Sequence, residues 1–129
     1  MRNKEPLITE HMKIWIKDGI IHTEFTENTI VTLEVAVEIV KQRKEYTEGY
    51  SYNGMVDITN LKSVELAARK YWASEESYAS INKLAIFSNS PVSRIIANFW
   101  LKIDKPYRPT KFFTNRGSAI MYLTEIIPN

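Results

Sequence analysis

An Asp-Gly pair at positions 18 and 19 separates two runs of alternating apolar and polar residues, MKIWIK and IIHTEF. Asp-Gly is favoured in the two-residue turn of a β-hairpin, because both turn residues there take positive φ. Pairing outward from this turn sets Lys17 opposite Ile20, Trp15 opposite His22 and Met12 opposite Phe25. The sequence therefore predicts an antiparallel hairpin over residues 12–25, and with it a sheet.

The two faces of this hairpin differ in polarity. One face carries Met12, Ile14, Ile16, Ile21, Thr23 and Phe25, and the other carries Lys13, Trp15, Lys17, Ile20, His22 and Glu24. The first set is apolar enough to face a core, whereas the second mixes charges with aromatic rings. We therefore expect helices to cover one side of this sheet only.

Helix and strand signals alternate over the rest of the chain. Helices are predicted after the N-caps Thr32 and Ser63 and after Ser90-Pro91, because proline suits the first helical position. Strands are predicted at 54–59, 83–87 and 110–114, and a last helix carries Ala119, Ile120, Leu123 and Ile127. In the helix that begins at Pro91, the stripe expected to be buried comprises Val92, Ile95, Ile96, Phe99 and Ile103.

This order predicts one α/β domain spanning residues 1–129. Strand-helix-strand crossovers are nearly always right-handed, so successive helices fall on the same face of a parallel sheet. We expect a mixed sheet of about five strands with an N-terminal hairpin, and about four helices packed mainly on one face.

Composition narrows the class of protein. Of the 129 residues 44% are apolar and none is cysteine, which suits a globular protein in a reducing compartment. No apolar stretch approaches the roughly 20 residues that span a bilayer. The start, MRNKEPLITEH, also lacks the apolar core of a signal peptide. We expect a cytoplasmic protein with no integral membrane segment.

Charge is distributed unevenly along the chain. Residues 1–64 carry 8 Lys or Arg against 10 Asp or Glu, a balance of −2, while residues 65–129 carry 9 against 5, a balance of +4. A late cluster of Lys105, Arg108, Lys111 and Arg116 could bind an anion, although ordinary solvated loop charge also accounts for it. The net charge of +2 is low for a nucleic-acid-binding domain, so no nucleic acid is expected as a partner.

Three stretches of the sequence, taken in order, resemble one known family. VDITNLKSVELAARKYW lies in the middle of the chain, and IFSNSPVSRIIANFW followed by PTKFFTNRGSAIMYL lies near its end. With the order of elements, they resemble the STAS domain and the SpoIIAA-like proteins, in particular a small uncharacterised bacterial branch. This resemblance covers nearly the whole chain and implies a SpoIIAA-like fold with a regulatory role.

The resemblance also implies a test for a phosphorylation switch. In STAS-type anti-sigma-factor antagonists, phosphorylation of a serine in an Asp-Ser pair breaks partner docking. The comparison places the acid of that pair at Glu65 and the serine at Leu66. The usual phosphorylatable serine is therefore absent, and the nearest hydroxyl, Ser63, is most simply a helix N-cap.

Signals for catalysis are weak in this sequence. There is no Gly-x-Ser-x-Gly elbow, phosphate loop or dinucleotide fingerprint, and the two histidines, His11 and His22, lack metal-site spacing. Asp57 could act with Glu65 as an acid or base at the end of a parallel strand, but a loop acid that caps the next helix accounts for it. We expect neither catalysis nor a cofactor.

Two functions stay open on the sequence. One is a module that binds a protein partner, or a second copy of itself, through exposed aromatic surface at Trp15, His22, Tyr71, Trp72 and Trp100. The other is a binder of a small ligand, with ligand or regulatory positions at Asp57, Ser63, Glu65, Ser88 and Asn89; the resemblance to the SpoIIAA-like superfamily implies that this ligand is lipid-like or nucleotide-like. An interface requires an exposed apolar patch, whereas a binder requires a cavity with a few convergent polar groups.

Overall fold

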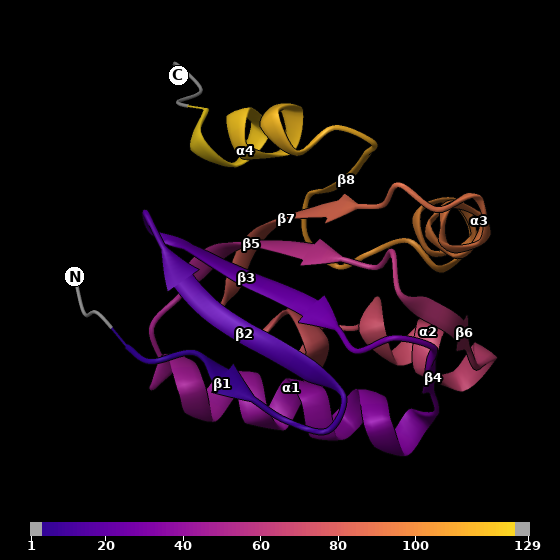
Figure 1. The fold of residues 1–129 in the computed structure, drawn as a ribbon, viewed down its shortest axis with the longest axis horizontal. Coiled ribbons are helices and arrows are strands. Elements are labelled where there is room, and N and C mark those ends of the chain that lie inside the picture. Colours follow the sequence, from indigo (N-terminus) through magenta and orange to yellow (C-terminus); the bar gives the residue numbers. More distant parts are fainter. Residues whose placement is uncertain (1–3, 126–129) are drawn as a thin grey trace.

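A six-stranded mixed sheet forms the centre of the computed structural model, which describes residues 4–125 (Figure 1). Its strands are β1 (Leu7–Ile8), β2 (Met12–Lys17), β3 (Ile20–Phe25), β5 (Tyr52–Asp57), β7 (Ile81–Phe87) and β8 (Thr110–Phe113), in that order across the sheet. The first three strands are antiparallel, and β3, β5, β7 and β8 run parallel to one another. The predicted mixed sheet is confirmed, whereas Ile127, predicted for the last helix, lies outside the described residues.

The hairpin of β2 and β3 has the predicted register. Met12 pairs with Phe25, Trp15 with His22 and Lys17 with Ile20. Asp18 and Gly19 both have positive φ, at 53° and 77°, as the two-residue turn requires. This local turn chemistry places one set of side chains, including the fully buried Met12, against the core.

Helices fill the crossovers between the parallel strands. They are α1 (Leu33–Thr47), α2 (Leu66–Trp72), the single 3₁₀ turn η1 (Glu76–Tyr78), and α3 (Pro91–Phe99), which continues as the π-helical segment η2 (Trp100–Asp104). The parallel strands follow one another in a single direction across the sheet, so right-handed crossovers bring these helices to one side. Figure 1 shows α1 and α2 beneath the sheet, and α3 lies at its end.

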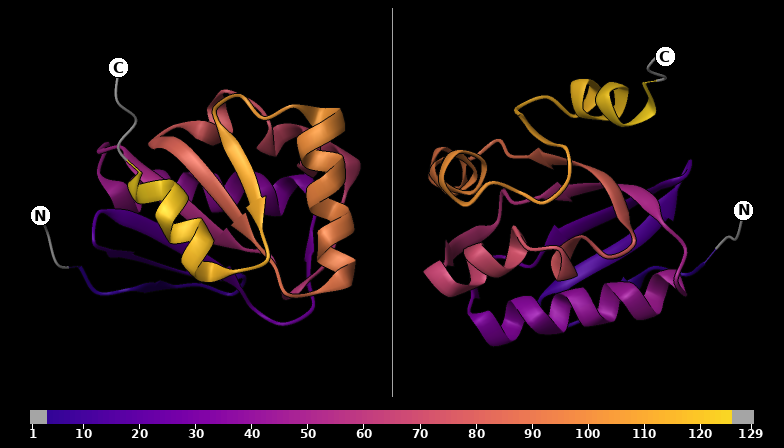
Figure 2. Two further views of the ribbon diagram at one scale, coloured as in Figure 1. Left: turned by 90° about the horizontal axis from the view of Figure 1, so that it is seen from above. Right: turned by 180° about the vertical axis from the view of Figure 1, so that it is seen from behind.

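The last helix, α4 (Arg116–Thr124), lies on the opposite face of the sheet (Figure 2). Its Ala119 and Leu123 pack with Ile20, Met55 and Ala85 in a second, smaller core. The expectation that only one face is covered is therefore wrong. On this face α4 covers apolar residues of the sheet that would otherwise be exposed.

A small parallel sheet of β4 (Thr29–Val31) and β6 (Leu61–Val64) was not predicted. It contains Ser63, which pairs with Ile30, so the prediction that Ser63 caps a helix is wrong. Residue Glu65 occupies the N-cap position of α2 instead, without a capping hydrogen bond from its side chain. Strand pairing across a long sequence separation overrides the local capping preference here.

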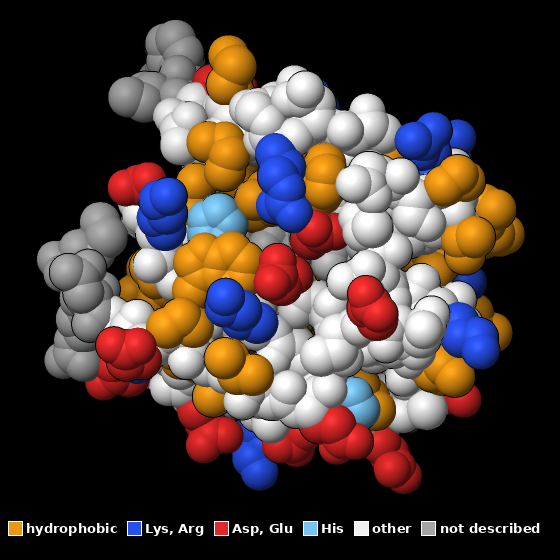
Figure 3. Space-filling model, in the orientation of Figure 1, with side chains coloured by type: hydrophobic (Ala, Val, Ile, Leu, Met, Phe, Trp, Pro, Cys, Tyr) orange, Lys and Arg blue, Asp and Glu red, His pale blue; other side chains and the backbone are white. Residues whose placement is uncertain are grey.

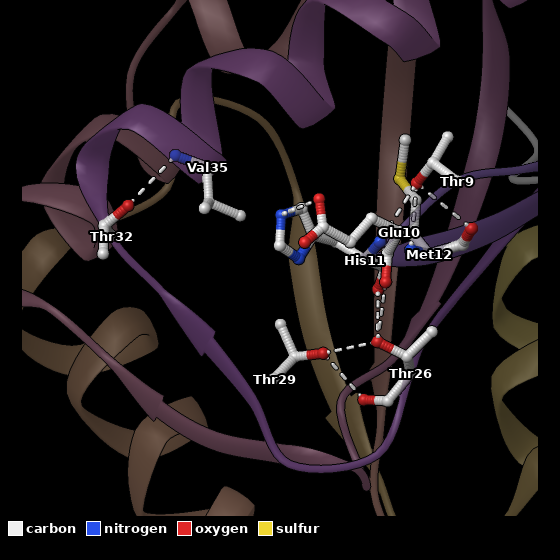
Figure 4. Close-up of polar contacts among 8 residues, drawn as sticks. All are labelled: Thr9, Glu10, His11, Met12, Thr26, Thr29, Thr32 and Val35. Atoms are coloured by element: carbon white, nitrogen blue, oxygen red, sulfur yellow. Dashed lines mark hydrogen bonds and ion pairs between the residues drawn. The ribbon is translucent and has the colours of Figure 1, made fainter.

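Threonine side chains fix the start of α1 and the chain around it (Figure 4). Thr32 caps the helix as predicted, since its Oγ1 accepts a hydrogen bond from Val35 N at 3.2 Å. The Thr29 hydroxyl donates to the carbonyl oxygen of Thr26 at 2.7 Å, and the Thr9 hydroxyl accepts from Met12 N at 3.1 Å. The Thr9 bond closes the turn between β1 and β2, whereas the Thr29 and Thr32 bonds satisfy backbone groups along the path from β3 into α1.

The helix α3 begins at Pro91 as predicted, and Ile96 packs against the core, but the prediction is wrong for the other four residues of the expected buried stripe. Its large apolar residues Val92, Ile95, Phe99 and Ile103 are 58%, 59%, 43% and 60% exposed. The buried residues are instead the small Ser93 and Ala97, followed by Trp100 in η2. Small side chains let the helix backbone approach the rest of the core closely, so the larger side chains point away from it.

Candidate functional site

The exposed apolar side chains of α3 and η2 form a single stripe. We call Val92, Ile95, Phe99 and Ile103 the α3 stripe; their spacing of three or four residues places them along one side of the helix. Figure 3 shows hydrophobic side chains gathered at the edge of the molecule where α3 lies in Figure 1. Large apolar residues exposed in such a row are the kind of surface that marks a protein interface.

The α2 helix borders this stripe. The guanidinium of Arg69 lies over the Phe99 ring, 5.0 Å from its centroid. Leu66, which is exposed, is three residues before Arg69 and therefore lies on the same side of α2. Leu66 is therefore an exposed apolar residue one helical turn before the arginine that contacts Phe99, at the position where the family resemblance places a phosphorylatable serine.

Positive charge surrounds the α3 stripe. Five exposed cations follow along residues 91–111, namely Arg94, Lys102, Lys105, Arg108 and Lys111. The one acidic residue of this segment, Asp104, has a side chain only 2% exposed and forms an ion pair with Arg69. The exposed charges of this segment are therefore all positive, and the stripe has a basic rim.

The predicted anion-binding residues are only partly brought together. Lys105, Arg108 and Lys111 line one surface hollow, together with the apolar Leu101 and Phe112. Arg116 is engaged elsewhere, in an ion pair with Asp57. The prediction of a four-residue anion cluster is therefore wrong for Arg116, whose counter-ion lies at the end of a neighbouring strand.

Asp57 has a structural role at the end of β5. Its Oδ1 accepts a hydrogen bond from Thr59 N at 2.9 Å, and its Oδ2 pairs with Arg116. The Arg116 guanidinium also lies 4.5 Å from the centroid of the Phe87 ring. Asp57 therefore stabilises a turn and links β5 to α4, and the prediction that it caps the next helix is wrong. The ion pair also offsets the cost of a cation at the N-terminus of α4.

The serine and asparagine expected to line a ligand pocket at the strand ends do not do so. Ser88 is fully buried, and its hydroxyl oxygen accepts from Ser90 N at 2.9 Å and bonds the Ser93 hydroxyl. Asn89 is exposed, and its backbone N–H donates to Thr59 Oγ1 at 3.3 Å. These groups bond one another around two adjacent turns, so they anchor the start of α3 and do not converge on a cavity.

On the sheet face next to α4, Trp15 and His22 stack with ring centroids 5.1 Å apart. Lys13 lies 5.3 Å from the Trp15 ring centroid, and His22 is buried. Burial lowers the pKa of His22 below its usual value, and the nearby positive charges of Arg116 and Lys17 lower it further, against a smaller opposite effect from Asp18. His22 is thus a buried part of the second core and only Trp15 is partly accessible.

We expect His22 to make the fold acid-sensitive. Because its pKa is lower in the folded than in the unfolded chain, its stabilising contribution is complete above about pH 6.5 and is lost as the pH falls through the folded-state pKa. Urea midpoints measured at about pH 7.5 and about pH 5 should therefore fall further for the wild type than for His22→Gln. An equal fall in both proteins would contradict this assignment.

Two of the predicted interface aromatics belong to the core. Trp72 and Trp100 are only 6% and 4% exposed, and their rings pack with centroids 5.6 Å apart. Tyr71 is half-buried, and its hydroxyl donates to Glu76. The prediction that Trp72 and Trp100 lie on an interface is wrong, because helical packing turns both indoles toward the sheet.

A cavity of about 50 Å³ lies within this core, between the sheet and the helices that cover it. Most of its lining is apolar, and includes Met12, Ile14, Ile21, Phe25, Trp72 and Leu84. Arg43 and Trp100 also line it, and their Nε and Nε1 atoms are buried without a hydrogen-bond partner. Arg43 was not predicted from the sequence as a functional residue. Its spacing from Ala36, Ile39 and Val40 does place it on the buried side of α1.

Over residues 4–125, none of the helices is long and apolar enough to cross a bilayer. The same part of the chain contains no group of three or more histidine, aspartate or glutamate side chains arranged to hold a metal ion.

Comparison with known proteins gives the fold and the family. A solved structure of an uncharacterised protein from the DUF3478 family, from Shewanella loihica PV-4, has a SpoIIAA-like fold. The match covers 95% of this chain and 98% of that chain, with a TM-score of 0.59 and 15% sequence identity. The predicted SpoIIAA-like fold is thereby confirmed.

Comparison with curated proteins gives no match. One family model matches residues 14–127, and this protein therefore belongs to the family described as a domain of unknown function, DUF7793.

Proposed function

We propose that this protein is a non-catalytic regulatory module that binds a protein partner through the α3 stripe. The observation that carries this proposal is the outward orientation of Val92, Ile95, Phe99 and Ile103, each more than 40% exposed. Leaving such side chains in water forgoes the hydrophobic stabilisation that a partner would restore on binding.

The charge around the stripe favours a partner with an acidic surface. Interfaces combine an apolar centre with a polar rim, and complementary charge across the rim speeds association and excludes wrong partners. The exposed Arg94 and Lys102 lie on the same helical segment as the stripe, and Lys105 follows directly. A second copy of this chain, docked stripe to stripe, would bring these like charges together. We therefore infer an acidic heterologous partner in preference to a homodimer through this face.

The residue at position 66 supports a regulatory role that is not controlled by phosphorylation at this position. In the family that this sequence resembles, a serine at the corresponding position switches partner docking when it is phosphorylated. Leu66 occupies that position here, one helical turn before Arg69, and Arg69 contacts Phe99 of the α3 stripe. The proposed module therefore keeps an apolar docking surface at this place but cannot be switched by phosphate on this side chain.

We also infer that the protein acts in the cytoplasm, since a chain of 129 residues without cysteine suits a reducing compartment. Fractionation of the native cells, with detection by antibody, tests this inference. Recovery of the protein in the membrane or secreted fraction would contradict it.

The docking surface can be tested with designed helical peptides of known charge. One peptide carries a leucine stripe flanked by glutamates, and a second carries the same stripe flanked by lysines. Fluorescence anisotropy should show that the glutamate peptide binds more tightly, with an affinity that falls as salt is added. Ile95→Asp and Ile103→Asp should each weaken its binding about tenfold or more, because each buries a charge in the apolar centre.

Val37→Asp is the matched control, because Val37 is an exposed apolar residue of α1 away from the α3 stripe. This variant should bind the glutamate peptide as the wild type does. Equal binding of the two peptides, or equal weakening by Val37→Asp, would count against the proposal. Light scattering tests self-association. If the wild type is a dimer and Ile95→Asp is a monomer, a second copy of this chain occupies the α3 stripe. If instead Trp15→Glu is the monomer, the dimer interface lies on the sheet face.

A further inference from the structure

We propose that the core cavity is a binding site for a small organic carboxylate, whose oxygens accept hydrogen bonds from Arg43 Nε and Trp100 Nε1. None of the residues of the α3 stripe lines this cavity, so the proposal does not depend on the docking surface.

Arg43 provides a buried positive charge that is held in place. Its Nη2 donates to the carbonyl oxygens of Ser77 and Ala79, the latter at 2.9 Å. These bonds hold the guanidinium in place. Arg43 as a whole is half-buried, but its Nε–H is fully buried and has no hydrogen-bond partner. No carboxylate within residues 4–125 forms an ion pair with Arg43, so its charge is balanced only by carbonyl dipoles. A buried cation in this state favours an anionic ligand.

Trp100 supplies a second donor from a different element. Its indole Nε1–H can only donate, and it is buried in a residue that is 4% exposed. Tryptophan N–H groups normally find a partner when they are buried. Two unpartnered donors on residues that line one cavity therefore require acceptor atoms, and a carboxylate supplies two oxygens to match them.

The remaining walls define the rest of the ligand. Apolar side chains from the sheet, including Ile14, Ile21 and Leu84, line the cavity with the ring of Trp72. A hydrogen atom or a methyl group is the chemistry that these walls accept, because it loses no hydrogen bonds on entering them. The volume of about 50 Å³ admits only the smallest carboxylates, so formate and acetate are the probes that we would use.

The charge state of Arg43 suits this ligand at neutral pH. Burial lowers its pKa to about 10, so the guanidinium remains protonated there although it has left bulk water. Tyr78, another residue of the lining, stays neutral, since burial raises its pKa to about 12. The anion would therefore meet one positive charge and no ionised tyrosine from this residue.

Nuclear magnetic resonance of ¹⁵N-labelled protein tests the site directly. Sodium acetate, titrated against sodium chloride at the same ionic strength, should shift the Trp100 Nε1–H and Arg43 Nε–H resonances in a saturable way. Neutral acetamide should bind at least about tenfold more weakly, because it brings no charge to Arg43. Arg43→Gln should weaken acetate binding by a similar factor, whereas Arg94→Gln, which removes an exposed arginine of α3, should leave it unchanged.

Trp100→Phe provides a second variant if Arg43→Gln does not fold, and it also identifies the Trp100 resonance. It should weaken acetate binding while the dispersed spectrum shows that the fold persists. Two results would overturn the proposal. One is the absence of a saturable shift with either formate or acetate. The other is contact of both N–H groups with long-lived water that neither probe displaces, since a cavity of this size can hold ordered water.

Discussion

Trp72→Ala is expected to lower the free energy of unfolding by about 3–5 kcal/mol, the usual cost of removing a buried tryptophan. Trp72 packs between Phe25 and Trp100, with ring centroids 5.9 Å and 5.6 Å from its own. Alanine would remove both ring contacts and enlarge the cavity that already adjoins this side chain. The surrounding sheet and helices cannot collapse fully into that space, so the cavity term adds to the lost burial.

Urea unfolding followed by circular dichroism measures this loss. The matched control is Tyr107→Ala, which removes an exposed aromatic ring and should change the free energy of unfolding by no more than about 0.5 kcal/mol. If Trp72→Ala were as mild as this control, Trp72 would be a surface residue and the aromatic core would be wrongly assigned.

Asp104→Asn is expected to cost about 3 kcal/mol of stability, because it leaves the Arg69 cation without its buried counter-ion. The Asp104 side chain is 2% exposed and that of Arg69 is 16% exposed, so water can replace little of the lost interaction. This ion pair joins α2 to the end of η2. Its loss should also loosen the segment that carries the α3 stripe.

The comparison for Asp104→Asn is Arg116→Gln, which breaks the more exposed pair with Asp57. An exposed ion pair contributes about 0–1 kcal/mol, so this variant should remain close to the wild type in thermal and urea unfolding. Hydrogen exchange should rise in η2 for Asp104→Asn and not for Arg116→Gln. Equal losses in the two variants would show that burial does not strengthen the Arg69–Asp104 pair.

Features that depend on neighbouring residues in the chain were predicted well. The register of β2 and β3 follows from Asp18-Gly19, because only a tight turn with two positive φ angles joins the strands there. The starts of α1 and α3 follow from Thr32 and Pro91, whereas strand pairing overrides the similar local signal at Ser63. The order of strands and helices then led to the mixed sheet through the handedness of the crossovers.

The candidate site was predicted poorly, because each of its features depends on which side of an element is covered. Periodicity placed Val92 and Ile95 on one side of a helix but could not tell that Ser93 and Ala97 would face the core. Trp72 and Trp100 were assigned to the surface for the same reason. Asp57 and Arg116, 59 residues apart in the chain, meet only because α4 returns over the second face of the sheet.

Local turn and capping chemistry therefore specifies the hairpin and the starts of α1 and α3 in this protein, since those interactions form within a few residues. Long-range packing alone establishes the outward α3 stripe, the buried ion pair of Arg69 with Asp104, and the cavity beside Arg43. Burial depends on the assembled layers, because a side chain lies in the core or on the surface according to what packs against it. The sequence pattern of one helix does not determine which neighbour that will be.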